Sequence, residues 1–143
     1  MVRLANENDA KRLAEISFSN VSPAWNETDF LGAIQNTQAI VLVKEDAMLL
    51  GYAVCYFAAD EGEIPSIAVD ASHRRKGIGN ELFEALSSYI KEMNITRLFL
   101  EVREGNAPAV CFYKSNGFLE VGRRKDFYHD PTEDALVMEK QFT

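Results

Sequence analysis

The stretch HRRKGIGN, residues 73–80, places three consecutive cations before two glycines in a chain that is otherwise acidic. It follows a β-rich run over residues 61–71, and apolar residues then recur every three or four positions from residue 78 to residue 93, which predicts a helix. The free N–H groups of a helix N-terminus attract anions, and glycines let an anion approach the backbone closely. The stretch therefore predicts a site for a phosphate-bearing ligand, with a solvated basic loop as the alternative.

The composition is that of one soluble domain, residues 1–143, with 47% hydrophobic and 26% charged residues. The 22 acidic residues outnumber the 15 basic ones, which argues against a nucleic-acid or membrane-surface binder. The first residues, MVRLANENDAKRL, lack the apolar core of a signal peptide, and no apolar run is long enough to span a membrane. We therefore expect a cytoplasmic protein with neither a nucleic acid nor a membrane as partner.

The cysteines and histidines do not form a metal-binding pattern. Cys55 and Cys111 lie far apart in apolar surroundings, without metal-ligand or CxxC spacing, and we expect both to be buried, reduced thiols. His73 and His129 are isolated from each other and from the cysteines. No metal is assigned to the chain.

The remaining patterns predict a strand-rich α/β or α+β domain. A hairpin is expected over residues 39–59, a bulge or an unpaired edge at Pro65, and a helix capped by Asn106 and ended by Gly117. Because few strands are joined by crossover helices, the sheet should be mixed and mostly antiparallel, not doubly wound. The expected strands lie at residues 2–4, 39–45, 49–59, 61–71, 96–102, 118–128 and 134–142, and the expected helices follow Asn6, span 27–35 and 78–93, and follow Asn106.

Two nucleotide-binding motifs compete for the glycine turn. A Walker loop is excluded because the sequence contains no GxxxxGK followed by Ser or Thr. A dinucleotide fingerprint fits poorly, because Leu82 stands where its third glycine belongs. Glu101 does fall near the spacing of a ribose-binding acid, so a nucleotide-binding module stays as a weak alternative.

Two segments resemble the acyl-CoA signature of the GNAT superfamily of N-acetyltransferases. VDASHRRKGIGNELFEAL (69–86) is similar to its R/Q-x-x-G-x-G/A loop, and LFLEVREGNAPAVCFYKSNGF (98–118) is similar to the strand and NxxAxxxYxxxGF helix that follow. The resemblance implies the GNAT fold, about seven strands flanked by about four helices, with acetyl-CoA as cosubstrate. The matching positions are Arg74, Gly77, Gly79, Asn106, Ala109, Tyr113, Gly117 and Phe118.

The same resemblance implies how acetyl-CoA is held. The strand from residue 66 to residue 69 should pair through its backbone with the pantetheine arm, and the amide near its end should polarise the thioester carbonyl. The basic glycine turn should hold the diphosphate. The implied cofactor-binding residues are Ile67, Ala68, Val69, Arg74, Arg75, Lys76, Gly77, Ile78, Gly79, Asn80, Asn106 and Tyr113.

Acetyl transfer to an amine needs a base and an acid, because the ammonium must lose a proton and the thiolate must gain one. The resemblance makes Tyr113 the acid beside the sulfur. The base is Glu101, on the strand before the Tyr113 helix, or Glu63, which occupies the position used by many lysine acetyltransferases. Both glutamates stay open as candidates.

Within the superfamily, SIAVD, LEVR and the closing DFY…EDALVM are similar to the ribosomal-protein-alanine acetyltransferase (RimI) branch. This implies direct transfer, in a ternary complex, to a protein N-terminal α-amine, possibly of a ribosomal protein, by a monomer or homodimer. Trp25 and Tyr128 are the predicted peptide contacts, with core packing as the alternative. Acetylation of a small-molecule amine or a lysine side chain, or CoA binding without catalysis, are the rival functions.

Overall fold

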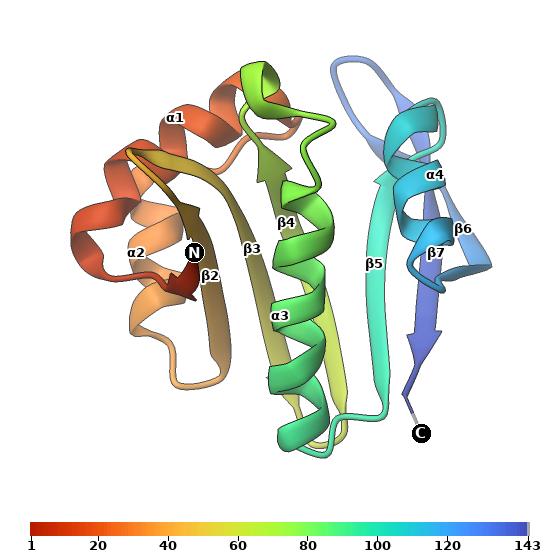
Figure 1. Ribbon diagram of the computed structural model, residues 1–143. Coiled ribbons are helices and arrows are strands. Elements are labelled where there is room, and N and C mark those ends of the chain that lie inside the picture. Colours follow the sequence, from red (N-terminus) through yellow and green to blue (C-terminus); the bar gives the residue numbers. More distant parts are fainter. Residues whose placement is uncertain (143) are drawn as a thin grey trace.

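The computed structural model describes residues 1–142 and contains the predicted order of strands and helices (Figure 1). Each predicted element is present, with ends that differ by a few residues at most. Its elements are β1 (Val2–Leu4), η1 (Glu7–Asp9), α1 (Ala10–Asn20), α2 (Glu27–Gln35), β2 (Ala39–Glu45), β3 (Leu49–Ala58), β4 (Glu61–Val69), η2 (Ala71–His73), α3 (Ile78–Glu92), β5 (Arg97–Arg103), α4 (Ala107–Ser115), β6 (Leu119–Tyr128) and β7 (Glu133–Gln141).

The described strands form one mixed sheet in the order β1-β2-β3-β4-β5-β7-β6. β4 and β5 pair in parallel, and the other neighbouring pairs are antiparallel. A parallel pair needs a crossover, which α3 supplies between these two strands. The predicted mixed, mostly antiparallel sheet is confirmed.

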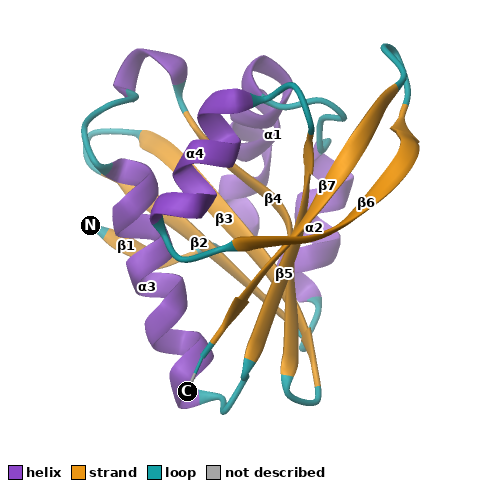
Figure 2. Ribbon diagram, turned by 90° about the vertical axis from the view of Figure 1, so that its right-hand side faces the viewer, coloured by secondary structure: helices purple, strands orange, loops and turns teal. Residues whose placement is uncertain are grey.

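The helices cover both faces of this sheet (Figure 2). α1 and α2 bury one apolar core, in which Leu13 and Phe30 are fully enclosed. α3 and α4 bury the other, in which the predicted apolar stripe of α3 from Ile78 to Ile90 packs against the sheet. The sequence spacing of three and four residues therefore identified the buried face of α3 correctly.

β4 and β5 are paired at one end only and separate at the other. Register pairs join Glu61 through Ile64 of β4 to Arg97 through Leu100 of β5, and beyond them β4 pairs with β3 alone while β5 pairs with β7. Figure 1 shows the two strands diverging toward the end of β4. β4 also bulges where Ile64 and Pro65 lie opposite Cys55, so both the bulge and the unpaired edge predicted from Pro65 are present.

Helix ends follow the predicted capping. The Asn106 side chain accepts a hydrogen bond from the Ala109 amide, and Gly117 has a φ of +93° just beyond α4. One local prediction is wrong. Cys55 is buried, but Cys111 is exposed, because its position on α4 faces away from the sheet that covers Tyr113.

Candidate active site

A cleft of about 820 Å³ opens where β4 and β5 diverge. Its walls come from both strands, from the start of α4, from the segment between α1 and α2, and from the end of β6. Among the residues predicted from sequence, those that line it are Trp25, Glu63, Ile67, Glu101, Asn106, Tyr113 and Tyr128. The divergence of one strand pair therefore brings the predicted acid, both candidate bases and both predicted peptide contacts to one place.

The β4 wall presents a backbone edge without a strand partner. Ser66 through Val69 pair with β3 on one side, and no strand within residues 1–142 pairs with their other side. Backbone N–H and C=O groups on such an edge can pair with an extended ligand. Ile67 lines the cleft, whereas Ala68 and Val69 continue the edge toward α3.

The basic glycine turn lies outside the cleft, at the N-terminus of α3. Gly77 has a φ of +77° and open space around a would-be Cβ, which suits a turn whose backbone must stay accessible. Gly79 is also required for packing, because a Cβ there would lie 3.1 Å from the Phe112 ring of α4. The second glycine thus allows α4 to pack against the start of α3.

The turn, which also contains Arg75, Lys76, Ile78 and Asn80, is held by two contacts with α1 at its start. Arg12 donates a 2.8 Å hydrogen bond to Asp70, and Arg74 donates a 2.6 Å hydrogen bond to Asn20. Hydrogen bonds from the Ser72 hydroxyl and amide, together with Arg12, hold the pKa of Asp70 well below its usual range. Asp70 therefore stays ionised at neutral pH and keeps the entry to the turn in place.

Glu101 lies on β5 with its side chain directed into the cleft, on the face opposite the buried Leu98 and Leu100, as strand alternation predicts. Its Oε2 is 2.8 Å from Arg124 Nε, but the angles do not make this contact a hydrogen bond, and that buried oxygen has no hydrogen-bond partner. Desolvation raises the pKa of Glu101; Arg124 opposes this effect and Glu63 adds to it. A partly buried carboxylate with a raised pKa is suited to accept a proton.

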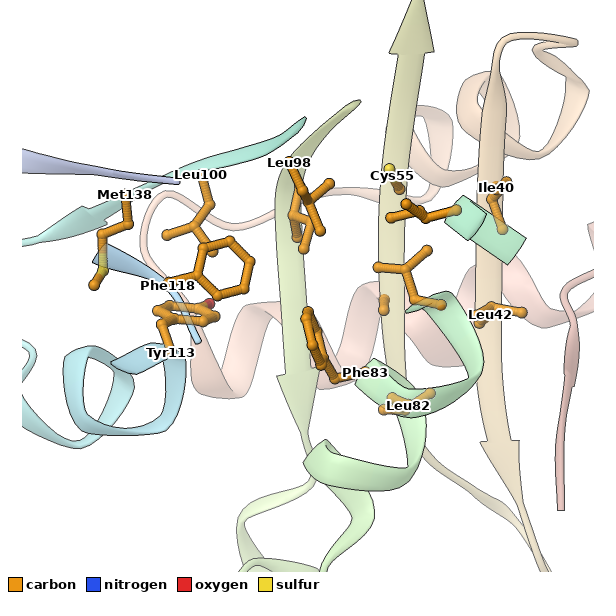
Figure 3. Close-up of a cluster of buried hydrophobic side chains, with 14 of the residues drawn as sticks. Ile40, Leu42, Cys55, Leu82, Phe83, Leu98, Leu100, Tyr113, Phe118 and Met138 are labelled. Atoms are coloured by element: carbon orange, nitrogen blue, oxygen red, sulfur yellow. The ribbon is translucent and has the colours of Figure 1, made fainter. Parts of the chain in front are cut away.

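Tyr113 enters the cleft from the opposite face of the sheet. Its ring packs against Phe112 and Phe118, with centroids at 5.5 and 5.8 Å, and Figure 3 shows it beside Phe118 and below Leu100. Burial raises the pKa of the Tyr113 hydroxyl above the ordinary tyrosine value. The phenol therefore keeps its proton at neutral pH, as an acid requires.

The two predicted peptide contacts have different surroundings. Trp25 packs against Phe30 at 5.2 Å and Tyr56 at 6.3 Å, so it belongs partly to the core as well as to the cleft. Tyr128 lies over the guanidinium of Arg103 at 4.4 Å, and desolvation raises its pKa to about 12. Core packing, the alternative to a peptide-binding role, thus accounts for part of the position of Trp25 and for less of that of Tyr128.

Sequence reasoning missed several lining residues, among them Arg103, Glu133 and Phe18. Arg103 and Glu133 form an ion pair at 3.2 Å, and Phe18 of α1 is 83% exposed at the rim. Strand alternation could have identified Arg103, which lies two residues beyond Glu101 on the same face of β5. Glu133 and Phe18 carried no comparable signal, because each reaches the cleft through tertiary packing.

Within residues 1–142 no cluster of side chains has a metal-binding arrangement. In the same part of the chain, no helix is both long and apolar enough to cross a membrane.

The strand order, the diverging β4–β5 pair and the basic glycine turn before α3 define an acyl-CoA-dependent N-acyltransferase. The chain belongs to the Acetyltransferase (GNAT) family, which matches residues 4–118, and the predicted family is confirmed. It is 35% identical over 139 residues to a Bacillus subtilis (strain 168) protein provisionally named a ribosomal protein bS18-alanine N-acetyltransferase, covering 96% of this chain and 92% of that one.

Two further matches come from Escherichia coli. The ribosomal protein bS18-alanine N-acetyltransferase of strain K12 is 31% identical over 116 residues, covering 80% of this chain and 78% of that one. The crystal structure of the E. coli ribosomal-protein-S18-alanine N-acetyltransferase superposes with a TM-score of 0.91 at 27% identity, covering 100% of this chain and 94% of that one. The predicted similarity to the ribosomal-protein-alanine branch is confirmed.

Proposed function

We propose that this protein transfers the acetyl group of acetyl-CoA to the N-terminal α-amine of a protein, with the N-terminal alanine of ribosomal protein bS18 as the first candidate acceptor. The observation that carries the proposal is the placement of Glu101 and Tyr113 in one cleft, from opposite faces of the sheet, in a chain similar to enzymes named for that reaction. This acceptor would place the protein in the cytoplasm.

The residues present fit acetyl-CoA. The unpartnered edge of β4 at Ser66 through Val69 would pair with the amide-rich pantetheine arm, with Ile67 facing the cleft. Arg74, Arg75 and Lys76, with the free N–H groups at the start of α3, would hold the diphosphate. Bound there, acetyl-CoA supplies an activated acetyl group as a thioester.

Glu101 is the better candidate for the base. It is partly enclosed, with 22% of its side chain exposed, and its raised pKa makes it a stronger proton acceptor than a solvated glutamate. Glu63 is exposed on β4, and its carboxylate adds to the negative potential around Glu101. We infer that Glu101 accepts a proton from the ammonium group of the acceptor, directly or through water, so that the neutral amine can attack, and that Glu63 attracts the cationic acceptor.

Tyr113 would donate its proton to the departing thiolate. Its raised pKa keeps the phenol protonated at neutral pH, so it can donate its hydrogen to the negative charge that develops on the CoA sulfur as the bond to the acetyl group breaks. Neither Cys55 nor Cys111 lines the cleft, so neither is placed to carry the acetyl group. This supports direct transfer to the amine in a ternary complex.

An N-terminal amine suits this site for two reasons. Its reference pKa of about 7.7–8.0 is well below the value of about 10.4 for lysine, so an N-terminal ammonium loses its proton to Glu101 more easily at neutral pH. Glu63 and Glu101 both line the cleft and favour an ammonium group. Phe18 and Phe127, both exposed on opposite rims, would contact the residues that follow the N-terminus.

The test is an acetyl-CoA assay with matched peptides. One peptide copies the first residues of ribosomal protein bS18 and begins with alanine; a second is the same peptide with a blocked N-terminus and an internal lysine. We expect acetylation of the first and little or none of the second. Equal turnover of the two, or turnover of small polyamines alone, would contradict the proposal and favour the lysine or small-molecule alternatives.

A further inference from the structure

Arg103 uses its whole guanidinium group to hold other parts of the chain. Its side chain is 14% exposed, and its five N–H donors make five hydrogen bonds. None of these contacts is needed to form β5, whose ladder to β7 already includes the residue. The side chain therefore serves to connect β5 to other segments.

The first connection reaches the segment between α1 and α2. Arg103 Nε donates to the Ser22 carbonyl at 3.0 Å, and Nη2 donates to the Ser22 hydroxyl at 3.4 Å. Ser22 itself lines the cleft, in the segment that leads to Trp25. One wall of the cleft is thus attached to β5 through this guanidinium.

The second connection reaches the turn between β6 and β7. Nη1 donates to the Pro131 carbonyl at 3.0 Å and to Glu133 at 3.2 Å, and Nη2 donates to the His129 carbonyl at 3.1 Å. The other carboxylate oxygen of Glu133 accepts from the Gly105 amide. The opposite wall of the cleft is therefore attached to the same side chain.

The shape of the group makes this arrangement specific to arginine. The guanidinium is planar, its donors point in fixed directions, and its face packs against the Tyr128 ring at 4.4 Å. A lysine would keep the charge but offers one ammonium group, which cannot reach two loops and an aromatic face together. Replacing the guanidinium would therefore break the hydrogen bonds to at least one of the two walls.

We propose that Arg103 is a positioning residue for the acceptor: it clamps residues 21–25 and the 129–132 turn to β5, so that the acceptor amine is held against Glu101. This inference rests on the proposed function, which assigns that part of the cleft to the acceptor. The β4 edge and the turn at residues 74–80 make no contact with Arg103 among the interactions described above. Acetyl-CoA binding should therefore not depend on it.

Arg103→Lys is the test variant, and Arg97→Lys is its matched control. Arg97 lies on the same strand, pairs with Glu139 at 2.8 Å and lies over the Phe99 ring at 4.8 Å, but it is outside the cleft. With the bS18-type peptide we expect Arg103→Lys to raise the acceptor KM about tenfold or more, because charge-assisted hydrogen bonds to both walls are lost. The KM for acetyl-CoA and kcat should change much less, and Arg97→Lys should alter none of the three.

Equal increases in both KM values, or an acceptor KM for Arg103→Lys that matches the control, would overturn the proposal. A second measurement needs no acceptor. Amide hydrogen exchange should accelerate about tenfold in Arg103→Lys at Trp25, whose amide donates to Ser17, and at Gly105, whose amide donates to Glu133, and it should stay unchanged in Arg97→Lys. Unchanged exchange at both amides would also refute the clamp. If the wild-type protein did not acetylate N-terminal peptides, that result would contradict the proposed function. The role of Arg103 in holding the two segments would still be tested by the exchange experiment.

Discussion

Replacing Tyr113 by phenylalanine should separate catalysis from stability. The ring contacts with Phe112 and Phe118 remain after the substitution, since they involve only carbon atoms. The environment of the Tyr113 hydroxyl is set by desolvation and neighbouring charges, with no hydrogen bond contributing to its pKa. Removing the hydroxyl therefore breaks no hydrogen bond that contributes to its pKa, and the free energy of unfolding should change by less than about 0.5 kcal/mol.

The effect on rate should be far larger. A positioned general acid contributes about 10²–10⁴-fold to a rate, which corresponds to about 3–5 kcal/mol in the activation barrier. We expect kcat of Tyr113→Phe to fall within that range at saturating acetyl-CoA and peptide. The assay is the release of free CoA thiol, with thermal unfolding measured on the same preparations.

Tyr52→Phe is the complementary control. Tyr52 is fully buried and shares a 2.6 Å hydrogen bond with Ser66, so its loss leaves a buried hydroxyl unpaired. That variant should lose about 1–3 kcal/mol of stability and keep most of its kcat. If Tyr113→Phe turned over like the wild type, or lost activity only in proportion to its stability, Tyr113 would not be the acid.

Three further predictions concern charged groups. Glu101→Gln should lower kcat more than Glu63→Gln, and equal small losses would exclude both glutamates as the base. Because burial raises the pKa of Glu101, the wild-type kcat/KM should begin to fall on acidification at a higher pH than it would with a solvated glutamate as base. Arg124→Met removes the cation 2.8 Å from Glu101, so that acid limb should move to still higher pH, which a pH–rate profile detects. Asp9 receives two hydrogen bonds from Arg3 that lower its pKa, so the stability that Asp9 contributes is present above its unfolded-state pKa and is lost as the pH falls through its folded-state pKa. Asp9→Asn should therefore destabilise the protein at pH 7 in denaturant titrations, and by progressively less as the pH falls.

Local patterns determined much of this protein. The apolar spacing after Ile78 identified the buried face of α3, and Asn106 and Gly117 marked the ends of α4, because caps and helix faces depend on residues within a few positions of each other. Strand alternation directed Glu101 away from the core for the same reason. The two motif segments also identified the family, because the motif residues occur at fixed spacings along the chain and can be read directly from the sequence.

Some features depend on neighbours that local patterns do not specify. Cys111 was expected to be buried, yet it is exposed, because the sheet covers another side of α4. Gly79 also makes room for the Phe112 ring, which a Cβ there would approach to 3.1 Å, and no local pattern predicted this contact. In both cases the deciding contact joins α4 to an element distant in the sequence.

The cleft itself belongs to the tertiary structure. The residues of β4 and β5 predict two strands, but only their packing against β3 and β7 makes them part after Ile64 and Leu100 and opens the space between them. The basic turn and the candidate catalytic side chains could thus be found one by one from the sequence. The meeting of Glu101 and Tyr113 in one cleft, and the attachment of its two walls to Arg103, arise from contacts between segments up to 81 residues apart, which no local pattern encodes.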